Sequence, residues 1–166
     1  MDEAQIMTTD LGNETGKQVL TFHLEGEVYG IDILDVREIR GWTPVMRLPS
    51  SSSWILGVLN LRGTVVPVLD LRLRFALNAA EFTPTTAVIV VAVGSAEGSR
   101  LCGIVVDEVA DVLDLKQEAL RQAPALSNSH SGKYLQQLAV VGDSMIMLLE
   151  TSALIGDELH NFDTAA

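Results

Sequence analysis

Histidine and cysteine side chains often carry nucleophilic or acid–base catalysis, and this chain has three histidines and one cysteine. A nucleophile needs a general base within hydrogen-bonding distance. His23 lies on the polar side of an alternating segment, His130 in a Ser-rich segment, and His160 near the C-terminus. Cys102 lies in an apolar segment, where a small buried hydrophobic residue is the expected role. No catalytic residue is predicted, and an enzyme is not expected.

Carboxylates are the other group that could carry chemistry, because they bind hard cations. Asp107, Glu108, Asp111 and Asp114 lie close together, but they lack the Asp/Asn and Gly spacing of a calcium loop. A solvated acidic face is the preferred interpretation. A single cysteine excludes a Cys-rich zinc site, and no glycine-rich loop carries the Lys-Ser/Thr of a P-loop. No metal and no cofactor is therefore predicted.

Arg62 is the charged residue whose position most suggests a binding role. Arg62 and Gly63 lie between two apolar segments, 57–61 and 64–71, which is typical of a β-hairpin. A guanidinium held at a junction of two barrels offers a fork of hydrogen-bond donors to a carboxylate or to backbone carbonyls. A solvated charge at the turn is the alternative.

The elements that must position these residues are mostly short β-strands. Residues 18–24 alternate between apolar and polar side chains, and residues 86–93 are apolar on both faces, as in a central strand. Further hairpins are predicted from apolar segments that flank turn residues: 18–24 with 28–33, 86–93 with 101–106, and 138–141 with 145–149.

Two short helices are also predicted. Ile33, Val36 and Ile39 recur every three residues, which predicts a short helix that Gly41 ends. Ile39 is expected in the core of this arrangement, whereas Val36 is as well suited to the surface. Thr151 or Ser152 can cap a C-terminal helix within residues 151–166.

The same order of elements occurs twice along the chain. When residues 29–33 are aligned with 102–106, Val36 aligns with Val109, Glu38 with Asp111 and Ile39 with Val112. Such a duplication predicts a mostly β protein of two similar barrels side by side. The first is expected at about residues 18–84 and the second at 85–150, and terminal strands could cross between them.

A second alignment within the duplication distinguishes Arg62. Residues 59–69 align with 138–148, which places Gly63 on Gly142 and Arg62 on Val141. A structural requirement shared by both copies would have kept the two residues alike. Arg62 is therefore expected to serve a task of the whole protein.

Composition excludes several classes of protein. The chain has 166 residues, 48% hydrophobic and 20% charged, with a net charge of −11, so it is globular and unsuited to phosphate backbones or anionic membranes. The longest wholly apolar run, residues 87–93, is too short to cross a membrane. Residues 1–17 are polar and are expected to form a mobile tail, and the acidic N-terminus lacks a secretory signal. A cytosolic protein is predicted.

With these motifs in order, the sequence resembles the CheW family of bacterial chemotaxis coupling proteins. The resemblance covers about residues 18–155, and the whole ordered series is far more specific than any one motif. It is carried by residues 29–33, 36–41, 57–63 and 66–72, and continues through 103–107, 109–112 and 142–143.

The resemblance implies a fold and a function. It implies two SH3-like, five-stranded β-barrels packed side by side, with a short helix between strands and a C-terminal helix. It implies a non-catalytic adaptor that links the cytoplasmic tips of chemoreceptors to the regulatory domain of the histidine kinase CheA. Such adaptors assemble into rings with the kinase in receptor arrays, and the receptor tip lies in the groove between the barrels.

The resemblance also implies site residues. The receptor-binding positions are Val36, Glu38, Gly57, Arg62 and Val109. Gly57 is expected to let a receptor helix approach closely. A kinase-binding contact is expected at Leu126, where many relatives carry an aromatic residue.

Two alternatives remain from the residues alone. A small-ligand-binding or hydrolytic barrel would use the same groove and would need convergent polar groups there. An acidic inhibitor that mimics DNA would bind a basic partner with a steep dependence on salt.

Overall fold

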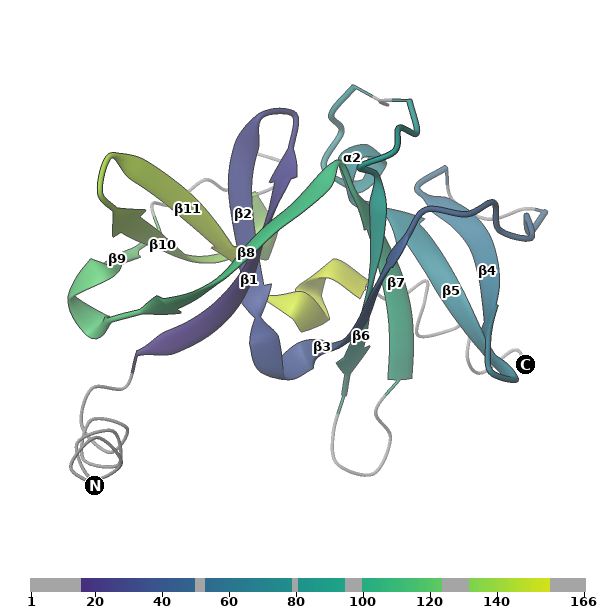
Figure 1. The fold of residues 1–166 in the computed structure, drawn as a ribbon, viewed down its shortest axis with the longest axis horizontal. Helices are drawn as coiled ribbons and strands as arrows, with labels where there is room; N and C mark the ends of the chain where they lie inside the picture. The colour runs from purple at the N-terminus through teal and green to yellow at the C-terminus, as the bar shows by residue number, and fades with distance from the viewer. Residues whose placement is uncertain (1–15, 50–52, 79–80, 95–99, 124–131, 156–166) are drawn as a thin grey trace.

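The computed structural model describes residues 16–49, 53–78, 81–94, 100–123 and 132–155. Strands account for most of these residues and form two curved sheets that lie side by side (Figure 1). Nearly all of the expected N-terminal tail, Leu126 and most of residues 151–166 lie outside the described residues.

Within the described ranges, one sheet has six strands and the other has five. In order across the sheet, the first contains β8 (Glu108–Leu115), β1 (Lys17–Leu24), β2 (Glu27–Asp32), β11 (Ser144–Leu149), β10 (Leu135–Val141) and β9 (Leu120–Gln122). The second contains β3 (Val36–Gly41), β6 (Ala87–Val93), β7 (Arg100–Val106), β5 (Thr64–Asp70) and β4 (Ile55–Leu61). The expectation of five strands in each is met by the second sheet, whereas the short β9 adds a sixth to the first.

Each sheet combines strands from both halves of the chain. The order β8-β1-β2-β11-β10 matches β3-β6-β7-β5-β4 position by position, including the parallel pairs β11 with β2 and β5 with β7. The structure therefore has the predicted duplication, with the first hairpin of each half built into the sheet of the other. The boundary expected near residue 84 does not separate the sheets, because β6 and β7 complete the sheet of β3–β5.

The hydrophobic residues form a core within each sheet and a larger core between the two. Val19 and Ile146 belong to the core of the six-stranded sheet, and Val66 and Val88 to that of the five-stranded sheet. The core between the sheets contains buried residues of both, listed here in part: Leu20, Phe22, Leu24, Ile31, Leu69, Ile89, Val91 and Ile104. Burial of one such side chain contributes about 1.5–3 kcal/mol, so the sheets are held together by the same effect that holds each one.

The helix predicted from the spacing of Ile33, Val36 and Ile39 was wrong. The structure has a 3-10 turn, η1 (Ile33–Asp35), followed by strand β3. The register of β3 against β6 shifts between Val36 and Glu38, so one extra residue lies between Val36 and Ile39. Such a bulge puts residues three apart on the same face of a strand, and it imitates the spacing of a helix.

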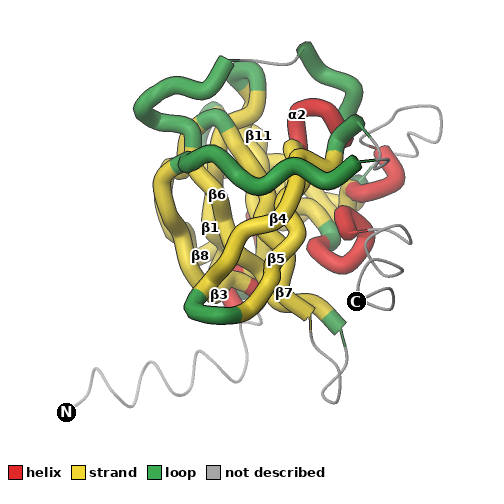
Figure 2. Tube along the Cα trace, turned by 90° about the vertical axis from the view of Figure 1, so that its right-hand side faces the viewer, coloured by secondary structure: helices red, strands yellow, loops and turns green. Residues whose placement is uncertain are grey.

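Helices are short in the described part of the chain. They are α2 (Leu71–Arg74), the 3-10 turns η2 (Gln117–Ala119) and η3 (Gly132–Tyr134), and the helical residues 151–155 at the predicted C-terminal helix. Figure 2 shows that most of the helical segments gather on one side of the strands. No helix among the described residues is long and apolar enough to cross a membrane.

Candidate functional site

Four apolar residues on the edge strands β3 and β8 face the space between the two sheets. On β3, Val36 lies opposite Val91 and Ile39 lies opposite Ile89. On β8, Val109 lies opposite Phe22 and Val112 opposite Leu20. All four partners belong to the core between the sheets, and directly opposed residues share a face of the sheet. We call Val36, Ile39, Val109 and Val112 the central apolar strip.

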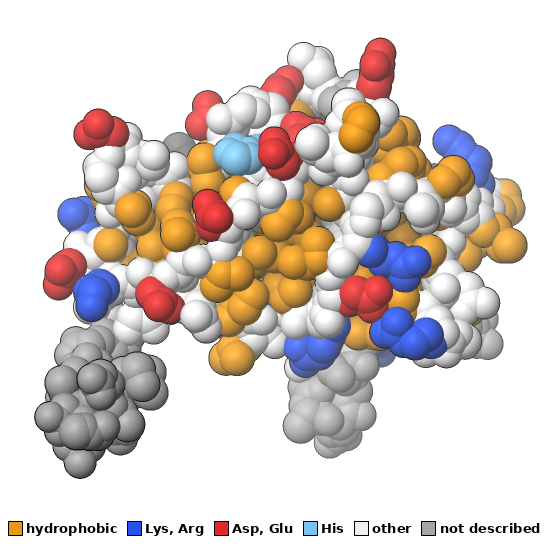
Figure 3. Space-filling view, in the orientation of Figure 1, with side chains coloured by type: hydrophobic (Ala, Val, Ile, Leu, Met, Phe, Trp, Pro, Cys, Tyr) orange, Lys and Arg blue, Asp and Glu red, His pale blue; other side chains and the backbone are white. Residues whose placement is uncertain are grey.

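The strip is partly open to solvent. Val36 and Val109 are half-buried against the core between the sheets, whereas Ile39 is 46% and Val112 51% exposed. Figure 3 shows hydrophobic side chains gathered in the middle of the face that β8 and β3 cross. Because contiguous exposed apolar surface usually marks a site of association, this strip is the strongest candidate for a binding surface.

The two sides of the strip are related by the duplication. β3 and β8 occupy equivalent edges of their sheets, and the register against the neighbouring strand shifts at the same place in both. Val36 thus corresponds to Val109, and Ile39 to Val112, as the alignment of the two halves predicted. The expectation that Ile39 lies in the core was wrong, because β3 is an edge strand and leaves this side chain 46% exposed. The alignment with Val112 was the signal that could have identified both exposed residues.

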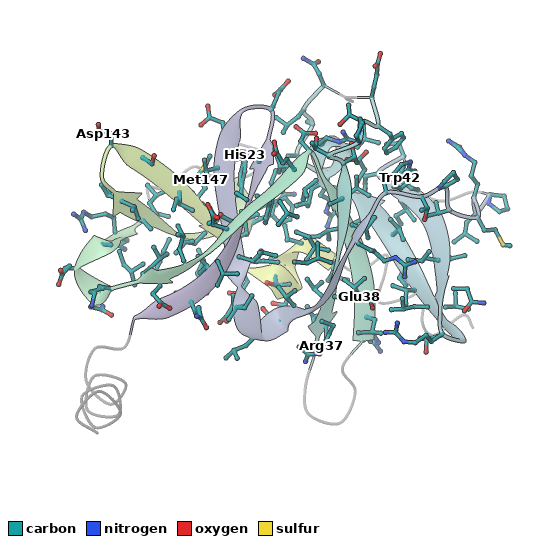
Figure 4. All side chains as sticks on the ribbon, viewed as in Figure 1. His23, Arg37, Glu38, Trp42, Asp143 and Met147 are labelled. Atoms are coloured by element: carbon teal, nitrogen blue, oxygen red, sulfur yellow. The ribbon has the colours of Figure 1, made fainter. Side chains whose placement is uncertain are left out.

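Glu38 forms an ion pair with Arg62. Arg62 Nη2 lies 3.0 Å from Glu38 Oε1, and Arg40 Nη1 lies 3.6 Å from Glu38 Oε2. The side chain of Arg62 is 76% exposed and that of Glu38 is 26% exposed, so this pair contributes only about 0.2–1 kcal/mol to folding. Figure 4 shows Glu38 on β3, in the middle of the molecule.

Arg62 occupies an unusual backbone conformation. The predicted hairpin is present, with Arg62 at φ 51° and Gly63 at φ 90° in the turn, and Asn60 Oδ1 accepts a hydrogen bond from Gly63 N. A side chain at such a φ costs about 1–2 kcal/mol compared with glycine. Arg62 shares this strained φ with Glu25, which precedes Gly26 in the β1–β2 turn.

The register of the two hairpins corrects the alignment around Arg62 by one residue. Leu61 pairs with Thr64, and Val141 pairs with Ser144. Arg62 therefore corresponds to Gly142, with φ 60°, and not to Val141. The conclusion that the second half has no arginine at this turn is unchanged.

A contact within the chain explains why residue 57 is a glycine. It is buried at φ 154°, and a Cβ on it would collide with the backbone oxygen of Met46. Met46 and Val58 exchange two backbone hydrogen bonds of 3.0 and 2.8 Å, which hold this segment across β4. The backbone of Met46 fills the space beside Gly57 and is a sufficient reason for glycine here, and the expected role of admitting a receptor helix stays a prediction.

The structure thus brings together part of the predicted set. Val36 and Val109 lie on the strip, and Glu38 and Arg62 form the ion pair at the neighbouring edge. Gly57 lies under the segment of Met46, and Leu126 lies outside the described residues.

A buried charge network that sequence reasoning missed fixes the start of β8. Arg72 is 1% exposed and donates to both carboxylate oxygens of Asp70, at 2.9 Å each, and to Asp107 Oδ1 at 3.0 Å. The other oxygen of Asp107 accepts from the backbone of Glu25 in the β1–β2 turn. The hydrogen bond to Asp70 raises the pKa of Arg72 above its usual value. This network ties the crossover between the two sheets to a fixed position.

Cys102, the single cysteine, lies in the core. Burial raises the pKa of the Cys102 thiol to about 12, so the reactive thiolate is disfavoured. Among the described residues, no three His, Cys, Asp or Glu side chains come together as metal ligands.

Comparisons with known proteins point to one family. Residues 18–159 match the family model of the CheW-like domain. The chain is 42% identical to the chemotaxis protein CheW of Klebsiella aerogenes over 147 residues, which are 89% of this chain and 86% of that protein. It is 30% identical to the chemotaxis protein CheW of Bacillus subtilis over 152 residues, covering 92% and 94% of the two chains.

A solved structure has the same fold. The crystal structure of the scaffolding protein TtCheW from Thermoanaerobacter tengcongensis superposes with a TM-score of 0.73 at 26% identity, over 82% of this chain and 90% of that one. The duplicated β fold, the matched domain and these relatives together show that the chain belongs to the CheW family.

Proposed function

We propose that this protein is a non-catalytic scaffold that couples chemoreceptors to the histidine kinase CheA. The observation that carries the proposal is the central apolar strip, whose exposed residues Ile39 and Val112 come from equivalent edges of the two sheets. The membership in a family of chemotaxis proteins, one of them described as a scaffolding protein, supports the same function.

The receptor contact is assigned to the strip and to the ion pair beside it. Val36 and Val109 supply partly buried apolar contacts, and Ile39 and Val112 extend them toward solvent. Arg62 and Glu38 add charge at the edge of β3 and hold the β4–β5 hairpin next to it. Gly57 remains among the proposed receptor-binding residues, and it lies where the segment of Met46 pairs with β4.

The kinase contact is assigned to the segment of Leu126. Binding both partners at once raises the effective concentration of receptor near kinase. Receptor state then biases the kinase through these contacts, and further contacts build rings in the array. The protein is placed in the cytoplasm at membrane-associated arrays, without a cofactor, without nucleic acid and without insertion into the membrane.

The first test measures CheA autophosphorylation with receptor-containing membranes, in the presence and absence of the protein. Strong activation only when all three components are present is the expected result. A folded protein that binds CheA without activating it would serve another class of receptor. A protein that neither binds nor activates would overturn the proposal and favour a small ligand in the same region.

A further inference from the structure

The apolar residues of the central apolar strip do not by themselves favour one direction of a bound helix over the opposite direction. Val36 and Ile39 correspond to Val109 and Val112 through the duplication, and both pairs face the same core. A rotation that exchanges β3 with β8 therefore leaves the apolar contacts nearly unchanged. A helix lying on this strip would make the same apolar contacts in either direction.

The charges beside the strip are not shared by the two sides. On the β3 side stand Arg37, Arg40 and Arg62, whereas the corresponding residues on the β8 side are uncharged: Ala110, Leu113 and Gly142. β8 instead carries Glu108, Asp111 and Asp114 and has no Lys or Arg along its length.

The acidic residues show where the asymmetry lies. Glu38 corresponds to Asp111, so an acid is common to both sides, but Glu38 is neutralised by Arg62 and Arg40. Asp111 bonds through its backbone to the hydroxyl of Thr21, and its side chain is exposed. In Figure 3, the side chains directly to the right of the central hydrophobic surface are mostly Lys and Arg, with an acidic side chain among them. Asp and Glu side chains lie above this surface and to its left, and Lys and Arg side chains are also present at the far left.

We propose that this charge asymmetry selects one of the two directions for the helix that binds the strip. The partner is an amphipathic helix whose apolar face carries acidic residues along one flank and basic residues along the other. Its acidic flank lies toward β3 and its basic flank toward β8. The identification of this helix with the receptor tip rests on the proposed function.

The expected preference follows from exposed charge pairs. One such pair changes an equilibrium about 1.4- to 5-fold, and it weakens with salt because exposed charges are screened beyond about 8–10 Å. If one basic residue on the β3 side and one acidic residue on the β8 side are exchanged, each flank of a helix bound in the original direction meets a like charge where it met an opposite one. We expect the ratio of the two directions to change about ten-fold.

The test uses a soluble helical fragment of a chemoreceptor tip that carries a nitroxide on its acidic flank. Methyl NMR of the full-length protein reports which residues the nitroxide broadens. With the natural sequence, Val36 and Ile39 are expected to broaden more than Val109 and Val112. The exchange variant Arg40→Asp with Asp114→Arg keeps the net charge, and we expect it to shift broadening toward Val109 and Val112.

A matched control separates direction from overall charge. The variant Lys133→Asp with Asp143→Arg makes the same exchange at exposed residues outside the strip, and Asp143 lies at the far end of the β10–β11 hairpin (Figure 4). It should leave the broadening pattern unchanged. If the double variant does not fold, Asp114→Arg alone replaces it, and we expect about half of the shift in broadening.

The outcomes distinguish the two proposals. An exchange variant that binds the fragment in the original direction overturns the role of the charges and leaves the coupling function intact. A natural protein whose strip methyls are not broadened at all overturns the assignment of the strip, and the inference about direction falls with it. Equal broadening of both sides in the natural protein also overturns the inference.

Discussion

Glu38 and Arg62 are 3.0 Å apart although they belong to opposite edges of the five-stranded sheet. Glu38 lies on edge strand β3, and Arg62 lies at the turn that ends the other edge strand, β4. The pair therefore closes the curved sheet on itself at one place. The equivalent position in the other sheet is Gly142, which has no side chain to form such a pair.

Replacing Arg62 tests whether this closure serves binding more than folding. Arg62→Glu places two acidic side chains next to each other and should abolish receptor recruitment. The free energy of unfolding, measured in urea, should change by no more than about 1 kcal/mol. Arg62→Gly removes the strained φ and should be as stable as the natural protein, yet bind receptor more weakly. Recruitment is measured by co-sedimentation with receptor membranes.

The exchange Glu38→Arg with Arg62→Glu keeps the pair and reverses it. Recovered recruitment would show that the closure itself is needed, and continued loss would show that Arg62 contacts the receptor. Full recruitment by the folded single variant Arg62→Glu would contradict the assignment of this site.

A charged side chain at either exposed residue of the central apolar strip should leave the free protein folded. Val112→Asp and Ile39→Asp are expected to weaken receptor binding at least ten-fold, because a charge on the strip must lose its water when the partner covers it. The stability of the free protein should change by about 0.5 kcal/mol or less. Met145→Asp, at a similarly exposed apolar residue of β11, is the matched control. Equal effects of all three variants on receptor binding would argue against the strip.

Gly57 is predicted to be a folding residue. Gly57→Ala forces a methyl group into the backbone of Met46 and should lower the free energy of unfolding by about 1–3 kcal/mol. Gly41→Ala is the control, because nothing lies near its Cβ position. Urea titration measures both. If Gly57→Ala were fully stable and failed only to bind receptor, the original expectation of a close receptor approach would be restored.

The buried network of Arg72 predicts that a single variant is less stable than a double variant that also removes the partner charge. Arg72→Met leaves the carboxylate of Asp70 buried without its partner and should cost about 3–5 kcal/mol. Arg72→Met with Asp70→Leu removes both charges and should recover much of this loss. A double variant as unstable as the single one would show that the network is required for more than neutralising Asp70.

Cys102 predicts a loss of stability in alkali. Its pKa is raised by burial to about 12, above the ordinary value of 9.0, so the folded state keeps a proton that the unfolded state releases. The stabilising contribution is complete below about pH 9 and is lost as pH rises toward about 12. Cys102→Ala should flatten this decline by up to about 1.4 kcal/mol per pH unit.

The pKa of Tyr29 is also raised, by burial and by Glu27 and Glu25, so part of the alkaline decline should remain in Cys102→Ala. Unfolding in urea at several pH values measures the slopes. Identical slopes for the two proteins would contradict the burial of a protonated thiol.

Local patterns predicted much of the secondary structure. The hairpin at Arg62 and Gly63 and the central strand β6 were read from turn residues and apolar runs, and the structure confirms both. The pattern failed at β3, where the bulge after Val36 gives the spacing of a helix. This bulge is a shift in the pairing of β3 with β6, which lies far along the chain. The residues near Val36 therefore cannot predict it by themselves.

The sequence by itself determined the duplication, the hairpins and the equivalence of Val36 with Val109, because these depend on the order and types of neighbouring residues. The tertiary structure decided which strands share a sheet, the meeting of Glu38 with Arg62, and the contact between Gly57 and Met46. Each of these joins segments that are distant along the chain. Such contacts form only when burial of the shared core brings both sheets together, and that is a property of the whole folded chain.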